Sequence, residues 1–394
     1  MYFSISPILL LLLVSLVAAE NYIVVVKPGN GGAVGGLISS LLGKTVPGLL
    51  QFTSGSFAGF KADLTPAQVA LLRANSNVQY IEKDGQLRTW GVIHRENHSF
   101  KRTVLTQSPS TWGLERISQK TKALAPYQYV YDSTAGAGTC IYIIDSGIYT
   151  AHNDFGGRAS FVQNFVSYET GDDLSGHGTA VAAAAAGTSY GVAKLAKIFS
   201  IKVCNQSGSC DVSAVVAGIS AATNNAQSQQ CPNGVVINLS LGGPSAGWQS
   251  VKDAIIAATQ AGVFVVAAAG NDHANMNNYL PASAAGACAV GATDQNDAIW
   301  SYSNYGSMMA VFAPGVGIQT AGLGSPSASV TVDGTSMSAP YVAGLGAYLW
   351  AKNGKGAGSA PGVALCNTIK TTANANVITG SLGGSPNRLA YNGM

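Results

Sequence analysis

Three side chains that together support acyl transfer stand in segments of unusual composition. Asp145 follows the apolar segment 139–144, His177 stands between two glycines, and Ser336 precedes a long apolar run. A serine hydroxyl becomes a nucleophile when a histidine accepts its proton, and an acid orients and stabilises that histidine. The three residue types, in the order Asp, His, Ser, therefore predict nucleophilic attack on a carbonyl group if the fold brings them together.

Each of the three residues also has an ordinary explanation. Asp145 could cap a turn, His177 could face solvent at a helix start, and Ser336 could be a plain N-cap. Chemistry is favoured at Ser336 because unpaired N–H groups and the helix dipole stabilise an anion at the first turn. Asn271 ends the apolar segment 265–270, and its amide could donate a second hydrogen bond to the same anion.

The elements that must position these residues alternate between strand and helix. Apolar, strand-like segments occupy 139–144, 195–203, 235–239 and 262–268, and helical segments occupy 179–186 and 251–260. Short buried strands that alternate with helices are typical of a mostly parallel sheet covered by helices on both faces. Ligand and catalytic groups collect at the carboxyl ends of such strands. The sequence therefore predicts an α/β fold with Asp145 at that edge.

Residues 20–89 are expected to form a separate, smaller unit. Segments 22–26, 57–64 and 77–82 have the composition of strands, and Thr65, Pro66 and Gln68 open a helix with a capping box. These elements predict a small α+β domain. The polar segment 87–108 that follows has little apolar pattern and is interpreted as a connector. Its Lys101-Arg102 pair is either a dibasic cleavage target or part of an exposed linker.

The N-terminus and the composition limit the classes of protein to which this chain can belong. Met1–Ala19 has a short apolar block and a small-residue end, which predicts a secretory signal cut after Ala19; the block is too short for a membrane span. The chain has 394 residues, of which 47% are hydrophobic and 10% charged, with a net charge of +3. This charge is too small and too scattered for nucleic-acid binding.

Cysteine usage agrees with export. The even number of cysteines in an exported chain suggests three disulfides, although spacing alone leaves fifteen possible pairings. Zinc is a poor alternative because no Cys-x-x-Cys pair occurs. The six positions are Cys140, Cys204, Cys210, Cys231, Cys288 and Cys366.

Four motifs, in this order, resemble those of the subtilisin-like serine peptidases. They are DSG at 145–147, GHGT at 176–179, AAAGN at 267–271 and GTSMSAP at 334–340, and the fit is best to the proteinase K-like branch. The resemblance runs from about residue 105 to the C-terminus, and residues 20–89 resemble the family's inhibitory propeptide. It implies a signal at 1–19, a ferredoxin-like α+β propeptide with a cleavable linker at 20–104, and a subtilisin-like peptidase domain at 105–394.

The resemblance also implies a role for each site residue. Ser336 would be the nucleophile, His177 the base, Asp145 its orienting acid, and Asn271 with the Ser336 N–H the oxyanion hole. The family binds peptides as an extra strand between two segments, here about 208–212 and 240–244, with a broad preference for apolar or aromatic side chains. The implied substrate-binding residues are Gly208, Ser209, Val212, Ser240, Leu241, Gly242, Gly243, Ala268, Ala269 and Gly270.

Disulfides and metal content follow partly from the same resemblance. Cys140–Cys231 and Cys288–Cys366 match the branch's two bridges, whereas Cys204 and Cys210 match no family pair but are close enough for a loop bridge. Catalysis needs no cofactor in this family. Ala310 stands where the family's tight calcium site has an Asp, so that site is expected to be lost or weak, and other acids could build a different one.

The expected protein is a secreted, monomeric serine endopeptidase made as a precursor that cleaves itself within 87–107. Its partners would be protein and peptide substrates and its own propeptide, with no nucleic acid and no membrane after signal removal. An α/β-hydrolase esterase would need Gly-x-Ser-x-Gly and the order Ser, Asp, His, which this chain lacks. An inactive, peptide-binding relative would show a broken triad or no Asn271.

Overall fold

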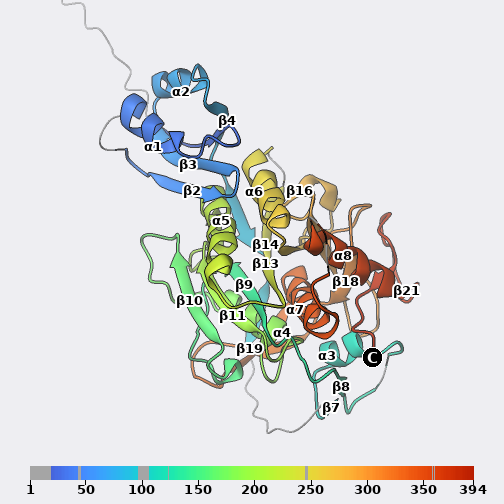
Figure 1. Cartoon of the computed structure of the whole chain (residues 1–394). Coiled ribbons are helices and arrows are strands. Elements are labelled where there is room, and N and C mark those ends of the chain that lie inside the picture. The colour runs from blue at the N-terminus through green and yellow to red at the C-terminus, as the bar shows by residue number, and fades with distance from the viewer. Residues whose placement is uncertain are drawn as a thin grey trace, which may run out of the picture.

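The structure is a computed structural model that describes residues 19–42, 46–95, 106–122, 124–244, 247–356, 358 and 360–394, with the backbone alone for 92–95. The expected signal segment, apart from Ala19, and the Lys101-Arg102 pair lie outside these residues. The described chain forms a small N-terminal unit that rests on a much larger one (Figure 1).

The small unit is a four-stranded antiparallel sheet with two helices. Its strands are in the order β2-β3-β1-β4, and with the helices between them they give the βαββαβ arrangement of ferredoxin-like domains. Thr65 caps the second helix, and its capping box with Gln68 is present as predicted. The elements are β1 (Glu20–Val26), α1 (Ala33–Leu37), β2 (Leu50–Ser54), β3 (Phe57–Leu64), α2 (Pro66–Arg73) and β4 (Val78–Lys83).

The large unit is built on a nine-stranded sheet in which every neighbouring pair is parallel except the last. The α/β prediction is therefore confirmed. In spatial order the strands are β10 (Ala159–Asn164), β11 (Lys197–Lys202), β9 (Thr139–Asp145), β13 (Gly234–Leu239), β15 (Phe264–Ala268), β17 (Ala287–Thr293), β18 (Val311–Pro314), β22 (Arg388–Leu389) and β21 (Asn374–Ala375).

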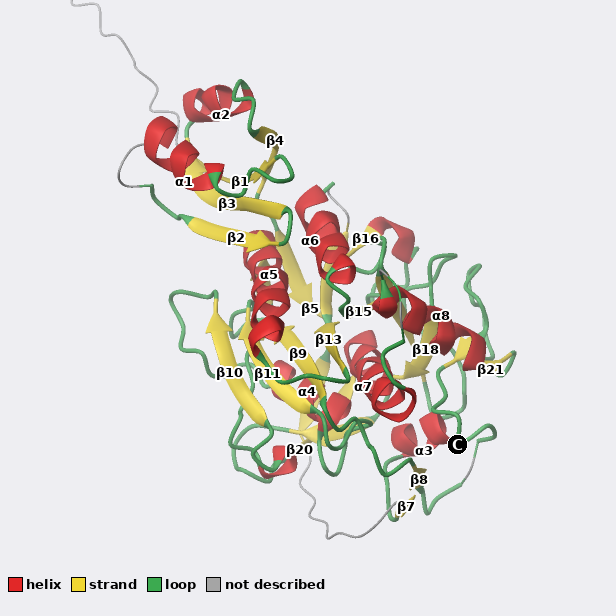
Figure 2. Ribbon diagram, viewed as in Figure 1, coloured by secondary structure: helices red, strands yellow, loops and turns green. Residues whose placement is uncertain are grey.

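Helices cover both faces of this sheet (Figure 2). The strand side chains alternate between two cores. Ile141 and Ile143 of β9 join the core under α4 (His177–Ala186) and α7 (Thr335–Asn353). Tyr142 and Ile144 join the core under α5 (Val212–Ser228) and α6 (Gln249–Gln260). The remaining helices are α3 (Trp112–Ser118) and α8 (Pro361–Thr372).

The two helices that carry His177 and Ser336 pack unusually close together. All ten residues of α4 are buried, as are Thr335 to Trp350 of α7. A Cβ placed on Gly344 of α7 would lie 2.4 Å from the Ala185 carbonyl oxygen of α4. Glycine at 344 is therefore needed for this close approach of α7 to α4.

Smaller strands complete the fold around the site. One sheet has the order β12-β5-β14-β16, a second has the order β19-β20-β6, and β7 pairs with β8. Their bounds are β5 (Gln86–Thr89), β6 (Val92–Arg95), β7 (Thr106–Gln107), β8 (Tyr129–Val130), β12 (Ser209–Asp211), β14 (Leu241–Pro244), β16 (Tyr279–Leu280), β19 (Ile318–Ala321) and β20 (Ser329–Asp333).

Segment 87–108, interpreted from the sequence as a connector with little apolar pattern, contains most of β5 and all of β6. Both strands are four residues long, too short to show an alternation of their own, and their pairing edges are supplied by distant segments. None of the helices in the described part of the chain has the length and apolar content to span a membrane.

The small unit packs through its sheet onto α5 and α6. Ile23, Phe52 and Phe57 belong to the same core as residues of these two helices. Polar contacts fix the arrangement: Glu82 accepts hydrogen bonds from the N–H groups of Gln249 and Ser250 at the start of α6, at 2.9 and 3.2 Å. Asp84 accepts one from the Ser213 N–H at the start of α5, at 2.9 Å. Acidic side chains are favoured at such helix N-termini.

Candidate active site

Asp145 and His177 form a buried, hydrogen-bonded pair. Asp145 is the last residue of β9 and His177 the first of α4, and their Oδ1 and Nδ1 atoms are 2.7 Å apart. Neither side chain is more than 2% exposed. The pairing fixes the tautomer in which Nδ1 carries the proton, so that Nε2 is the free basic nitrogen.

Two glycines and a second acid hold His177 at the start of its helix. Gly176 has a φ of 89°, which an ordinary side chain disfavours, and a Cβ on Gly178 would lie 2.0 Å from the Gly147 carbonyl oxygen. Asp173, which is buried, accepts hydrogen bonds from the N–H groups of Gly176 and Thr179, each at 2.8 Å. Asp173 is a site residue that sequence reasoning missed; its only signal is its place four residues before His177.

Ser336 lies in the first turn of α7, beside the free face of His177. A Cβ placed on Gly91 would lie 2.9 Å from both Ser336 Oγ and His177 Nε2, so the two atoms flank one point. The Ser336 carbonyl accepts a hydrogen bond from Ser240 Oγ at 2.8 Å, which ties the helix start to the segment after β13. The structure thus brings together Asp145, His177 and Ser336, which are distant in the sequence.

Asn271 faces the same point with its amide nitrogen. Its Oδ1 accepts hydrogen bonds from Thr335 N and Oγ1, at 3.0 and 2.7 Å, which turns Nδ2 toward the site. A Cβ on Gly334 would lie 3.1 Å from Asn271 Nδ2 and 2.9 Å from Ser336 Oγ. The donor amide, the nucleophile candidate and the helix N-terminus therefore surround one small space.

The pKa of His177 lies above its ordinary value. Burial lowers this pKa, but it is outweighed by the charge and hydrogen bond of Asp145, the charge of Asp173 and a backbone hydrogen bond of Trp90, which together raise it. The imidazole is thereby made a stronger base than a free histidine. This suits a group that accepts a proton from a hydroxyl.

The strand β5 lies between the two segments that the family resemblance assigned to peptide binding. Arg88 pairs with Ser209 on one side and with Gly242 on the other, both antiparallel. The Thr89 N–H donates to the Gly208 carbonyl at 3.0 Å, and the Trp90 N–H donates to the Ser240 carbonyl at 3.1 Å. The occupant of this cleft is therefore the chain's own segment 86–90.

The Trp90 ring fills a buried pocket at the end of this strand, and only 3% of the residue is exposed. Cβ atoms on Gly242 and Gly270 would lie 2.7 and 3.5 Å from the ring, and Tyr279 stands 6.3 Å away between ring centroids. Ala268 and Ala269 are buried in the strand end that precedes Gly270.

Four further placements refine the list of substrate-binding residues. Gly243 lies nearest Leu87 and not the Trp90 pocket. The Val212 N–H donates to the Gly85 carbonyl at 2.8 Å. Sequence reasoning missed Tyr279 and also Asp272, which pairs with Arg88 at 2.5 Å. Neither stands in a recognisable motif, so only the fold reveals them.

Comparisons with known proteins agree with this geometry. The model of the Subtilase family, Peptidase_S8, matches residues 136–390. A cuticle-degrading protease of Metarhizium anisopliae is 40% identical over 86% of this chain and 81% of its own. Proteinase R of Parengyodontium album is 38% identical over 95% of this chain and 89% of its own. The chain belongs to the subtilase family.

A solved structure supports the same assignment. A cold-adapted subtilisin-like serine proteinase matches with a TM-score of 0.65 and 34% identity, over 72% of this chain and 99% of its own. The expected family, the subtilisin-like fold and the enzyme class are therefore confirmed. This subtilase is a serine endopeptidase.

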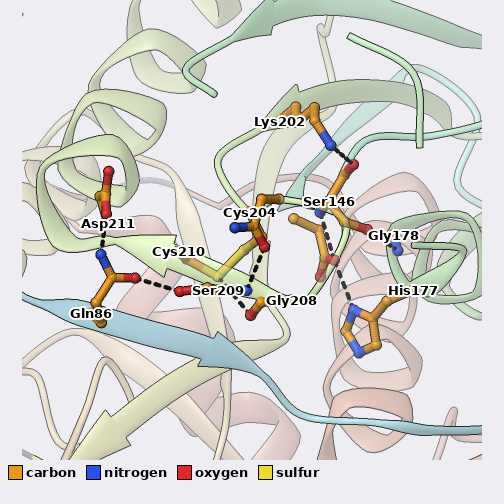
Figure 3. Close-up of a disulfide and its surroundings, with 12 residues drawn as sticks. Gln86, Ser146, His177, Gly178, Lys202, Cys204, Gly208, Ser209, Cys210 and Asp211 are labelled. Carbon is orange, nitrogen blue, oxygen red and sulfur yellow. Dashed lines mark hydrogen bonds and ion pairs between the residues drawn. A yellow bond between two sulfur atoms is a disulfide. The ribbon is translucent and has the colours of Figure 1, made fainter. Parts of the chain in front are cut away.

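Three disulfides join the six cysteines of this subtilase. They are Cys140–Cys231, Cys204–Cys210 and Cys288–Cys366. Figure 3 shows that the strand carrying Gln86 runs past the Cys204–Cys210 bridge and on below His177, while the Gln86 side chain contacts Asp211 and Ser209. This bridge thus closes the loop that forms one edge of the cleft occupied by segment 86–90.

At Ala310, where the family resemblance expects the acid of a tight calcium site, the structure has a buried methyl group and no carboxylate. Within the described ranges, no group of three or more His, Cys, Asp or Glu side chains is arranged to hold a metal ion. No step of the chemistry below uses a metal.

Proposed function

We propose that this subtilase hydrolyses peptide bonds through an acyl-enzyme formed on Ser336. His177 Nε2 takes the proton of Ser336 Oγ as the oxygen attacks the carbonyl carbon, and later gives that proton to the leaving amine. Asp145 holds the imidazole by the 2.7 Å hydrogen bond to Nδ1 and stabilises its charged form. Support comes from the convergence of these three buried side chains at one edge of the sheet.

The oxyanion of the tetrahedral intermediate is stabilised by Asn271 Nδ2 and the Ser336 N–H. The contacts of Asn271 Oδ1 with Thr335 support this role, because they leave the amide nitrogen as the group that faces Ser336. A donor that is already oriented costs no reorganisation when charge develops.

Substrates bind as the middle strand between Ser209–Asp211 and Leu241–Pro244, as β5 does in this structure. Main-chain pairing of this kind gives affinity with little demand on side chains, so specificity is broad. The pocket that holds Trp90 receives the side chain before the scissile bond. Its glycine and alanine walls favour apolar and aromatic side chains.

The enzyme is made as a secreted precursor in which residues 20–104 are the inhibitory propeptide and a cleavable linker. In this state the cleft is filled by the chain itself, and the small unit is held on α5 and α6. Self-cleavage after this unit then opens the cleft. Three disulfides fit an oxidising, extracellular compartment.

The observation that carries this proposal is the placement of segment 86–91 in the cleft, with Gly91 beside both His177 Nε2 and Ser336 Oγ. The test is to purify the wild-type chain, Ser336→Ala and, as a matched control, the exposed Ser327→Ala. Wild type and Ser327→Ala should shed the N-terminal unit and digest casein, whereas Ser336→Ala should do neither. Processing of Ser336→Ala would contradict self-cleavage, and casein digestion by it would contradict the nucleophile.

A further inference from the structure

The backbone from Gln86 to Arg95 crosses the site as two strands anchored on opposite sides. The first strand, β5, is paired with β12 and β14, and the second, β6, is paired with β20. Only Trp90 and Gly91 lie between the two strands. This peptide unit is therefore held over the site from both directions.

The Trp90 carbonyl faces the nucleophile. A Cβ placed on Gly334 would lie 2.5 Å from the Trp90 carbonyl oxygen, 2.9 Å from Ser336 Oγ and 3.1 Å from Asn271 Nδ2. The oxygen that would become an oxyanion thus shares one small space with the attacking atom and the donor amide. The buried Trp90 ring and the Trp90 N–H bond to Ser240 fix the orientation of this carbonyl.

Gly91 lies next to His177, the residue that carries the proton in the proposed reaction. A Cβ on Gly91 would be 2.8 Å from His177 Cδ2 and 2.9 Å from His177 Nε2. A side chain at this position would therefore press on the imidazole, and glycine avoids that clash. The residue after the Trp90 carbonyl is the one whose nitrogen must receive a proton when the peptide bond breaks.

We infer that the Trp90–Gly91 bond is the first bond that this chain cuts in itself, so that the processed enzyme initially begins at Gly91. The inference rests on the proposed function and adds the site of the cut. It places that cut upstream of Lys101-Arg102 and of residue 105, where the family resemblance begins. Any trimming at those later positions is then a second event.

The chemistry of this cut balances within the chain and one water. Ser336 Oγ bonds to the Trp90 carbonyl carbon while its proton passes to His177, and the bond to the Gly91 nitrogen breaks as His177 returns that proton to it. Water then attacks the ester, giving its proton to His177. Collapse releases Trp90 as a carboxylic acid and restores the Ser336 hydroxyl.

The position of the cut can be read from the earliest products. The full chain is refolded, sampled over a time course and analysed by intact mass and N-terminal sequencing. The first large fragment should begin at Gly91. A first fragment that begins elsewhere, with Ser336→Ala still uncleaved, would overturn the inference while leaving the proposed function intact; cleavage of Ser336→Ala would overturn the proposed function itself.

Variants sharpen this test. Gly91→Pro should yield no fragment that begins at residue 91, and Trp90→Asp should slow the first cut at least about tenfold, because an acid would enter an apolar pocket. Lys101→Gln with Arg102→Gln is the matched control and should leave the first cut unchanged. Loss of the first cut in this control would contradict the inference.

A peptide with the sequence of residues 84–96 removes any dependence on how the variants fold. The processed enzyme should cut it between Trp and Gly, and a peptide with Pro in place of that Gly should stay intact at this bond. Cleavage of the first peptide only at other bonds would count against the inference.

Discussion

At the scale of single residues, His177 sets the pH dependence of the enzyme. Its pKa is raised above the ordinary 6.5 because Asp145, Asp173 and the Trp90 backbone together outweigh the effect of burial. Below this pKa the imidazole is protonated and cannot accept the Ser336 proton, so kcat/KM should rise with pH through a midpoint above 6.5. The check is a pH profile of the processed enzyme on an uncharged peptide. A midpoint below the ordinary histidine value would contradict the proposed electrostatics.

Asn271 tests the oxyanion hole. Asn271→Leu should lower kcat about 10²–10³-fold with little change in KM, because the lost hydrogen bond forms only in the transition state. Thr335→Val is the matched control, because it removes the hydroxyl that donates to Asn271 Oδ1 but keeps the side-chain amide of Asn271. Steady-state kinetics on one peptide separate the two effects, and an equal fall in kcat for both variants would argue against a direct role for Asn271.

Asp272 should favour substrates with a basic residue two positions before the residue that enters the pocket. In this structure Arg88, two positions before Trp90, pairs with Asp272. The Arg88 side chain is 57% exposed, so the ion pair is worth about 0.2–1 kcal/mol. Asp272→Asn should therefore lower kcat/KM about two- to fivefold for a peptide with Arg at that position, and leave a peptide with Gln there unchanged. The same decrease for both peptides would exclude a charge effect.

At the scale of elements, the Cys204–Cys210 bridge holds one edge of the cleft in place. It joins Cys204 to Cys210, the middle residue of β12, whose main chain pairs with the bound strand. Cys204→Ser with Cys210→Ser should raise KM about two- to tenfold for peptides long enough to pair with β12, because binding must then order the loop. Peptides too short to reach β12 are the control. An unchanged KM for the long peptides would contradict this role.

The elements that can be predicted from the sequence are those whose own residues contain the apolar run, the small-residue run or the capping box. The central strands β9, β13 and β15 are largely apolar runs, α4 is a run of small residues, and Thr65 has its capping box within three residues, so each is visible in the sequence. The outer strands β10, β21 and β22 have no such run and are not predicted. By contrast, β5 and β6 owe their strand form to distant partner edges. Trp90, Gly91 and Asp272 gain their roles only through those pairings, and for this reason no local pattern marks them.

At the scale of the whole molecule, the small unit and the large one share a core and a set of helix caps. Burial raises the pKa of Glu82 and of Asp84, while hydrogen bonds from the starts of α6 and α5 work in the opposite direction. Tyr80 adds a 2.6 Å hydrogen bond to Asp253 of α6. These contacts hold β5 in register over the cleft, so the position of the first cut depends on the docking of a separate domain.

The most direct test of the central claim is covalent labelling of the nucleophile. The processed enzyme is treated with a fluorophosphonate, which reacts with serines activated by a neighbouring base, and the label is located by peptide mass mapping. The proposed mechanism predicts one label, on Ser336, that forms more slowly as the pH falls through the pKa of His177. A label on another serine, or a rate of labelling at Ser336 that does not fall at low pH, would contradict it.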